Sequence, residues 1–318
     1  MRTLLLSVLG AVLLLSVSAS AVTIDWTLVG DPGNACDTQA NGCFGSVADS
    51  YNIGTYEVTN TQYAEFLNAV ADTDTNALYN TDMGNVVNLQ GGITRSGSSG
   101  GYTYSAIVGR ENLPVNWVSF YDSLRFANWL HNDQPTGAQD NTTTEDGAYT
   151  NTAQGISNNS ITRNAGATIF LTSEDEWYKA AYYDAVSTSY FDYPAGSNAQ
   201  TTCATPTATA NQANCANAVG DLTDVGSYTG SASPYGTFDQ GGNVWKWNET
   251  ILSGSDRGLR GGSSGNGGAD NFAASTRNSV GPAYEYINVG FRVAPEPSTG
   301  LLVLAGLLGL AGWRRARA

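Results

Sequence analysis

Three long polar segments constrain the fold of this chain more than any other feature of its sequence. Residues 71–111, 133–166 and 184–234 consist mostly of Asn, Thr, Ser, Gly and Ala, and the whole chain contains 37 glycines. Such segments bury little apolar surface, so helix caps, disulfides or bound ions must hold them in place. Because few helical patterns lie between them, they predict an α+β domain with short strands, few helices and long loops.

The three helices that the sequence predicts each begin at a recognisable cap. Thr59 and Gln62 form a capping box, and the apolar residues after them have the i, i+3, i+4, i+7 spacing of one helix face. A second helix is expected to begin at Ser119. Ser173 and Glu176 form another capping box, in which acidic residues favour the positive end of the helix dipole.

The N-terminus has the layout of a secretory signal peptide. Arg2 supplies a positive charge, residues 4–17 are almost entirely apolar, and Ala19-Ser20-Ala21 is a small-x-small cleavage site. The apolar run is too short to span a bilayer comfortably. We therefore expect signal peptidase to remove residues 1–21, so that the mature chain starts near Val22.

The C-terminus carries a second membrane-directed segment. Pro295, Glu296 and Pro297 precede an uncharged apolar stretch, and the arginines of Arg314-Arg315-Ala316-Arg317 follow it, which places that end in the cytoplasm. This order resembles the PEP-CTERM sorting signal, which implies recognition by an exosortase. We expect residues 295–318 to hold the chain transiently in the inner membrane before its release to the cell surface or extracellular matrix. A permanent tail anchor is the alternative.

The charge balance excludes two classes of partner. The chain has 28 Asp and Glu residues against 14 Lys and Arg, which gives a formal net charge of −14. A surface with this charge repels nucleic acid and anionic lipid. The balance suits a soluble exported protein.

The four cysteines form two close pairs, Cys36 with Cys43 and Cys203 with Cys215. An exported chain meets oxidising conditions, so two local disulfides are the simplest interpretation. A metal site is the competing interpretation, but it lacks ligands, because neither pair has C-x-x-C spacing and His131 is the only histidine.

Six short motifs in a fixed order identify a family resemblance. They are Tyr56-Glu57-Val58-Thr59-Asn60, Pro114-Val115-Asn116-Trp117, Leu171-Thr172-Ser173-Glu174-Asp175-Glu176-Trp177, Gly242-Asn243-Val244-Trp245-Lys246-Trp247, Arg260-Gly261-Gly262-Ser263 and Asn288-Val289-Gly290-Phe291-Arg292-Val293. The series resembles the formylglycine-generating enzymes, or sulfatase-modifying factors, and covers the expected domain at 22–294. The resemblance implies an irregular variant of the C-type lectin fold that calcium often stabilises. We expect Trp117, Trp177, Trp245 and Phe291 to pack in one core.

The catalytic residues of the family do not carry over. Active members use a copper-binding cysteine pair placed after the Gly-Gly-Ser motif, and here no cysteine lies beyond Cys215. Ser263 matches a family serine but has no evident partner base. The relatives that use non-haem iron need several histidines, whereas this chain has only His131. We expect neither copper nor iron, because Asn and Asp oxygens are hard and redox-silent ligands.

One calcium segment of the family can be followed residue by residue. Asp239, Gly242 and Val244 take the places of three calcium ligands, but Lys246 replaces the family's glutamate. Either the ion is absent and Lys246 pairs with Asp239 in its place, or Lys246 faces solvent and Glu249 substitutes as a ligand.

Two further expectations concern binding. A second calcium site of the family maps less surely onto Asn211 and Asp221. A polar cleft for a ligand is expected to contain Ser263, Asn266, Asp270 and Arg277, whose hydroxyl, amide, carboxylate and guanidinium groups suit directed hydrogen bonds.

Two functions are compatible with these features. The first is a non-catalytic module at the cell surface or in the matrix that binds an extracellular glycan, a polymer or a protein. The second is a divergent oxidoreductase of the same family that uses non-cysteine groups in the same cleft.

Overall fold

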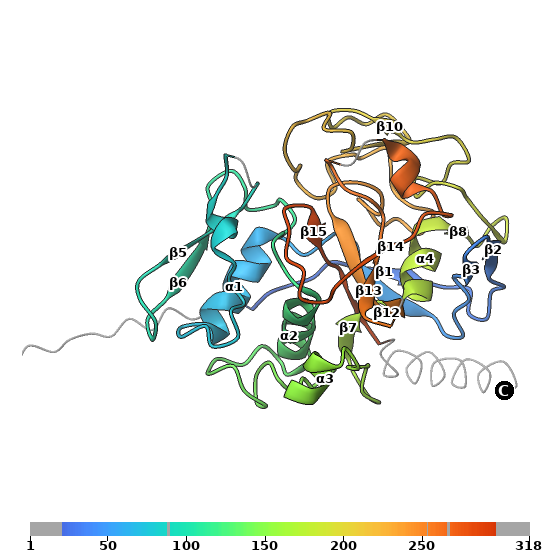
Figure 1. Cartoon of the computed structure of the whole chain (residues 1–318). Coiled ribbons are helices and arrows are strands. Elements are labelled where there is room, and N and C mark those ends of the chain that lie inside the picture. The colour runs from blue at the N-terminus through green and yellow to red at the C-terminus, as the bar shows by residue number, and fades with distance from the viewer. Residues whose placement is uncertain (1–20, 88–89, 253, 266–267, 297–318) are drawn as a thin grey trace, which may run out of the picture.

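The computed structural model describes residues 21–87, 90–252, 254–265 and 268–296. It confirms an irregular α+β domain in which short strands and long loops surround a few helices (Figure 1). The expected signal peptide up to residue 20, Asn266, and the C-terminal segment from Pro297 lie outside the described residues.

The three predicted helices form, and each begins at the predicted cap. They are α1 (Asn60–Val70), α2 (Phe120–His131) and α4 (Glu174–Tyr182), and all three N-termini have a complete capping box. A fourth short helix, α3 (Ala153–Ser157), was not predicted. It has only five residues, so it shows no helical period, but the Thr152 hydroxyl caps it by accepting from Gly155 N at 3.0 Å.

Most strands pair with a strand that is close in the sequence, and only one sheet has more than two strands in the described part of the chain. That sheet has the order β14-β13-β12-β15, in which β12 and β15 are parallel and the other neighbours antiparallel. Its strands are β12 (Trp245–Leu252), β13 (Asp256–Arg260), β14 (Asn278–Val280) and β15 (Val289–Gly290).

The remaining strands form two-stranded ribbons, and two 3-10 helices complete the elements. The ribbons are β1 (Trp26–Val29) with β4 (Tyr51–Gly54), β2 (Asp37–Gln39) with β3 (Gly42–Phe44), β5 (Ile93–Ser96) with β6 (Thr103–Ala106), β7 (Ile169–Leu171) with β16 (Val293–Pro295), β8 (Tyr183–Asp184) with β9 (Ser189–Tyr190), and β10 (Thr202–Cys203) with β11 (Gln212–Ala213). The 3-10 helices are η1 (Thr81–Gly84) and η2 (Ala269–Phe272).

The core is built from aromatic side chains, as expected for a fold with few hydrogen-bonded ladders. Trp117, Trp245 and Phe291 are buried in the main cluster, which also contains the inner faces of α1 and α2. Trp177 is fully buried but belongs to a second cluster with Phe44. The expectation of burial is therefore confirmed, whereas the expectation of one shared core is wrong. Figure 1 shows α4 and α1 on opposite sides of the molecule, with the strands of the β14-β13-β12-β15 sheet between them.

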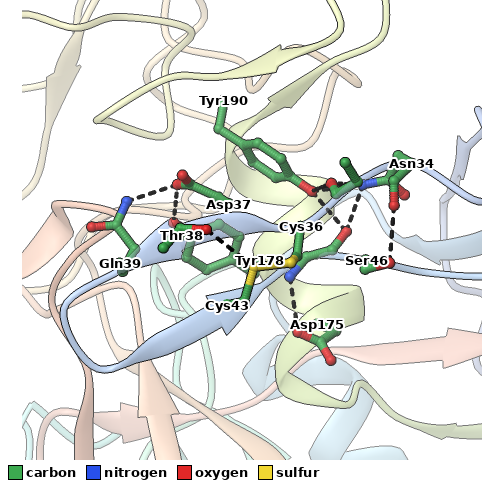
Figure 2. The surroundings of a disulfide bond; sticks show 12 residues. Asn34, Cys36, Asp37, Thr38, Gln39, Cys43, Ser46, Asp175, Tyr178 and Tyr190 are labelled. Carbon is green, nitrogen blue, oxygen red and sulfur yellow. Dashed lines mark hydrogen bonds between the residues drawn. A yellow bond between two sulfur atoms is a disulfide. The ribbon is translucent and has the colours of Figure 1, made fainter.

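Both predicted disulfides are present and close loops that have little apolar surface. Cys36 bonds to Cys43 with a Cα–Cα distance of 5.4 Å, and Cys203 bonds to Cys215 with a Cα–Cα distance of 4.9 Å. Figure 2 shows the first disulfide at the β2–β3 hairpin, which Asp175 of α4 holds by accepting a hydrogen bond from Gly45 N at 2.8 Å. Two disulfides indicate a protein of an oxidising compartment, either periplasmic or extracellular.

The first two residues of the expected sorting motif belong to the folded domain. Pro295 lies opposite Ile169 in the β16–β7 ribbon, and Glu296 N donates to Thr168 O at 3.0 Å. Ordered pairing therefore continues two residues past the expected domain end at 294. Among the described residues, no helix combines the length and apolar character needed to cross a membrane.

Candidate functional site

Ser263 was expected in a polar cleft, but it is fully buried. Its hydroxyl oxygen lies 3.4 Å from Asn288 Nδ2, which donates to it. Gly262 directly before it has a φ of 65°, and a side chain at this position would clash with Phe272. This left-handed turn explains why the serine points inward, a feature that the motif alone does not reveal. Asn266 lies outside the described residues.

The other two residues of the expected ligand set have partners of their own. Arg277 donates from Nε and Nη2 to the carboxylate of Glu174 at the start of α4. Asp270 in η2 accepts a hydrogen bond from Gln200. Arg277 is therefore part of a structural ion pair, and Asp270 has a partner outside the expected ligand set.

A pocket of about 490 Å³ opens beside this segment instead. This volume lies in the range of small-molecule binding sites. Among the residues that the structure describes, no charged side chain lines the pocket, and three of the seven lining residues carry side-chain amides. The lining residues are Gln90, Asn217, Ser264, Gly265, Tyr286, Ile287 and Asn288.

Two exposed tyrosines extend the pocket with an aromatic surface. Tyr286 is 44% exposed and Tyr284 is 39% exposed, and their rings stack with centroids 5.3 Å apart and an interplanar angle of 27°. The buried ring of Trp117 supports Tyr286 from below at a centroid distance of 5.6 Å. The two stacked rings form a contiguous exposed aromatic patch, which makes this pair a candidate contact site.

Hydrogen bonds to the backbone fix the walls of the pocket. The Asn116 side chain donates to Gln90 O at 3.1 Å and to Ile287 O at 2.9 Å, which joins two segments that are far apart in the sequence. Trp117 N donates to Tyr286 O at 3.1 Å. The segment carrying the tyrosines, which leads into β15, is therefore held in one conformation (Figure 1).

Two lining residues of the pocket and the supporting Trp117 have left-handed backbone conformations. Gln90, Asn217 and Trp117 have φ values of 51°, 58° and 60°. These conformations are not specific to the pocket, because eleven other non-glycine residues of the described chain also have a positive φ.

The sequence analysis did not predict this pocket, although the spacing of two tyrosines could have indicated an exposed aromatic surface. Tyr284 and Tyr286 are two residues apart, directly before the Asn288-Val289-Gly290 motif, in a segment that also contains Gly281 and Pro282. Aromatic residues in a segment with turn residues are candidates for exposure. Gln90 and Asn217 carry no such signal, because they lie in polar segments of similar composition.

The chain has no free thiol for cysteine-based oxidation. All four cysteines are in the two disulfides. His131 ends α2, and its Nδ1 accepts a hydrogen bond from Thr168 N at 3.0 Å. No group of three or more His, Cys, Asp and Glu side chains converges in a metal-binding arrangement within the described ranges.

The first expected calcium segment contains a buried ammonium group. Lys246 is fully buried, its Nζ donates to Gly242 O at 2.7 Å, and it lies 2.9 Å from Glu57 Oε1. Lys246 therefore pairs with Glu57, and the expected pairing with Asp239 is wrong. Glu249 does not substitute as a ligand here, because it binds Arg163.

The electrostatics of this cluster follow from its burial. Desolvation raises the pKa of Glu57 to about 7, against the opposing effect of the Lys246 ammonium. Desolvation also raises the pKa of Asp239 and lowers the pKa of Lys246. Asp239 accepts from Gly226 N at 2.6 Å, and Val244 packs its side chain against Leu113 and Leu222.

These residues do not fit a calcium ion. Calcium needs six to eight oxygens around an open centre. Here the Gly242 carbonyl and the nearest carboxylate, that of Glu57, already contact an internal cation. In the second expected site, Asp221 forms a two-point ion pair with Arg110, at 2.7 and 2.8 Å. Asn211 accepts from Thr201 and donates its amide hydrogens to neighbouring loop groups.

The fold and its motifs define a class of protein. Residues 37–297 match the family model described as the sulfatase-modifying factor enzyme 1-like domain, and the chain belongs to this family.

The solved structures that are similar to this chain share little sequence with it. One, described as the crystal structure of CarF, is 18% identical with a TM-score of 0.54, and the alignment covers 87% of this chain and 99% of the other. Treponema denticola variable protein 1 is 19% identical with a TM-score of 0.50, covering 88% and 98%. PvdO from Pseudomonas aeruginosa is 17% identical with a TM-score of 0.48, covering 86% and 92%. No curated protein sequence gives a significant match.

Proposed function

We propose that this protein is an exported, non-catalytic binding module that recognises a neutral glycan or a similar hydroxyl-rich polymer. The observation that carries the proposal is the uncharged, amide-lined pocket beside the exposed Tyr284–Tyr286 pair. It lies in a domain of an enzyme family whose redox chemistry needs thiols that are absent here.

The chemistry of the pocket matches a sugar. Carboxamide groups donate and accept hydrogen bonds, so the exposed amide of Asn217 complements hydroxyl groups that do the same. The other two amides of the pocket also have partners in the protein, since Gln90 donates to Gly220 O and Asn288 donates to Ser263. The apolar face of a sugar ring can pack on the ring of Tyr286, which Trp117 holds in place. A site of this kind combines an apolar platform with a few polar groups that set orientation.

The charge distribution favours an uncharged ligand. The pocket offers no Lys or Arg to an anionic polymer, and the chain as a whole has a formal net charge of −14. Negatively charged polysaccharides would be repelled over a distance of about 10 Å at moderate ionic strength. A neutral polysaccharide meets no such barrier.

The binding proposal is tested with an array of neutral and acidic polysaccharides, followed by calorimetric titration of the best ligand. Replacing Tyr286 with alanine should weaken binding at least about tenfold, which corresponds to about 1.4 kcal/mol. Trp26→Ala is a matched control, because Trp26 is similarly exposed at 38% but lies on β1. Equal affinities of the wild type and Tyr286→Ala for the ligand would exclude this pocket as the binding site.

Export is the second part of the proposal, and the two ends of the chain support it. We infer that signal peptidase cuts near Val22 and that an exosortase removes the C-terminal tail. Val22 is buried, and it exchanges two hydrogen bonds with the side chain of Gln134, at 2.6 and 2.8 Å, so the domain can anchor a chain that starts there. The intact mass of the secreted protein should correspond to a chain that lacks both ends. A mass that includes residues 298–318 would contradict the sorting proposal.

A further inference from the structure

The Lys246 ammonium lies in a set of oxygen acceptors of the kind that a structural metal ion would use. Lys246 is fully buried, and its Nζ contacts the carbonyl oxygen of Gly242 at 2.7 Å and the carboxylate of Glu57 at 2.9 Å. Gly242 has a φ of 92°, and a side chain there would meet Asn214 O at 2.5 Å. The backbone is therefore shaped to aim this carbonyl at the ammonium group.

We propose that two cations of the chain itself, Lys246 and Arg110, stand in for the structural calcium ions that this fold is expected to bind. The module then folds and functions independently of calcium. This inference rests on the two charge clusters alone and does not depend on the nature of the ligand.

The first cluster contains equal numbers of acidic and basic side chains. Glu57 and Asp239 supply two carboxyl groups, while Lys246 and Arg292 supply two cationic groups, and all four side chains are buried. Arg292 donates to the backbone oxygens of Gly54 and Phe238, which holds its charge beside the same acidic groups. A divalent cation added here would face two fixed positive charges in a site with little water.

In the second cluster the internal cation is an arginine, Arg110, instead of a lysine. Both carboxylate oxygens of Asp221 bind Arg110, whose Nη2 also donates to Gln90 O at 3.0 Å. This planar two-point pair occupies both carboxylate oxygens, the hard ligands that calcium would need. Both clusters therefore contain an internal cation, although Lys246 lies on β12 and Arg110 in a loop.

The test measures thermal unfolding of the folded domain in EDTA and in millimolar calcium. The wild type should have the same Tm in both, to within about 1 °C, because a ligand that does not bind the native state cannot shift the equilibrium. Equilibrium dialysis of the wild type should find no stoichiometric calcium. A calcium-dependent rise in Tm, or one bound ion per chain, would overturn the proposal.

A variant that reverses the charge of Lys246 tests whether the site can be converted into a calcium site. Lys246→Glu removes the ammonium and adds a carboxylate beside Glu57 and Asp239, so this variant should have a lowered Tm in EDTA that calcium raises by several degrees. Lys246→Met is the matched control, since it removes the cation without adding a ligand, and calcium should not restore its Tm. If folded Lys246→Glu did not respond to calcium, the ammonium would not occupy a site equivalent to a metal site. If neither variant folds, the dialysis of the wild type decides.

Discussion

Replacing Glu174 with glutamine should lower the free energy of unfolding by about 3–5 kcal/mol, because it leaves a buried guanidinium without its counter-ion. Glu174 is the first residue of α4, and Arg260 and Arg277 both bind its carboxylate. Arg260 is fully buried, and it also donates to the carbonyl oxygens of Ala274 and Thr276. The glutamine keeps the shape of the side chain and removes only the charge.

Urea denaturation of the wild type and the variant measures this effect. Glu65→Gln on α1 is the control, because it makes the same chemical change at a residue without an ion pair in the described structure. That change should stay within about 0.5 kcal/mol. A loss of less than 1 kcal/mol in Glu174→Gln would show that the arginine network does not hold the C-terminal half of the domain to α4.

Stability should fall as the pH rises from about 5 to about 8. Asp122 is buried next to the carboxyl group of Glu285. Desolvation is the main cause that raises the pKa of Asp122 to about 8, and repulsion by the Glu285 carboxylate is the second cause. Desolvation raises the pKa of Glu57 to about 7, and it also raises the pKa of Glu285. Carboxyl groups with raised pKa values hold protons that the unfolded chain has already lost. Their contribution is complete at low pH and is lost as the pH passes through the folded-state pKa.

The expected slope is about 1.4 kcal/mol per pH unit for each proton retained only by the native state. Asp122→Asn should reduce the slope of stability against pH by the contribution of about one proton, because an amide cannot ionise. The amide can still accept from Ser119 N and donate to Glu285. Urea titrations at four pH values measure both slopes. Identical slopes in the wild type and Asp122→Asn would contradict the assignment of this proton to Asp122.

Local features of the fold were predictable from the sequence. The helix caps depend on residues three positions apart, and the disulfides join cysteines seven and twelve positions apart, so short-range patterns suffice. The burial of the aromatic residues in the motifs was predictable for a different reason. Large apolar side chains favour the interior, and a domain rich in polar loops offers few other apolar groups to form its core.

The features that were missed depend on long-range contacts. Lys246 finds its counter-ion in Glu57, which is far away in the sequence and belongs to a motif that was read only as a family marker. Ser263 points inward because of a left-handed glycine turn and its contact with Asn288. The pocket itself combines Gln90, Asn217 and Tyr286, which no local spacing connects.

The central claim is that this domain keeps the family fold without the family's redox chemistry, and one assay tests it directly. The purified protein is incubated with a cysteine-containing sulfatase-motif peptide, oxygen and copper, and mass spectrometry then follows the peptide. Both cysteine pairs are closed as disulfides and no other thiol exists in the chain, so the peptide cysteine should remain unmodified. Conversion of that cysteine to formylglycine would contradict the non-catalytic account.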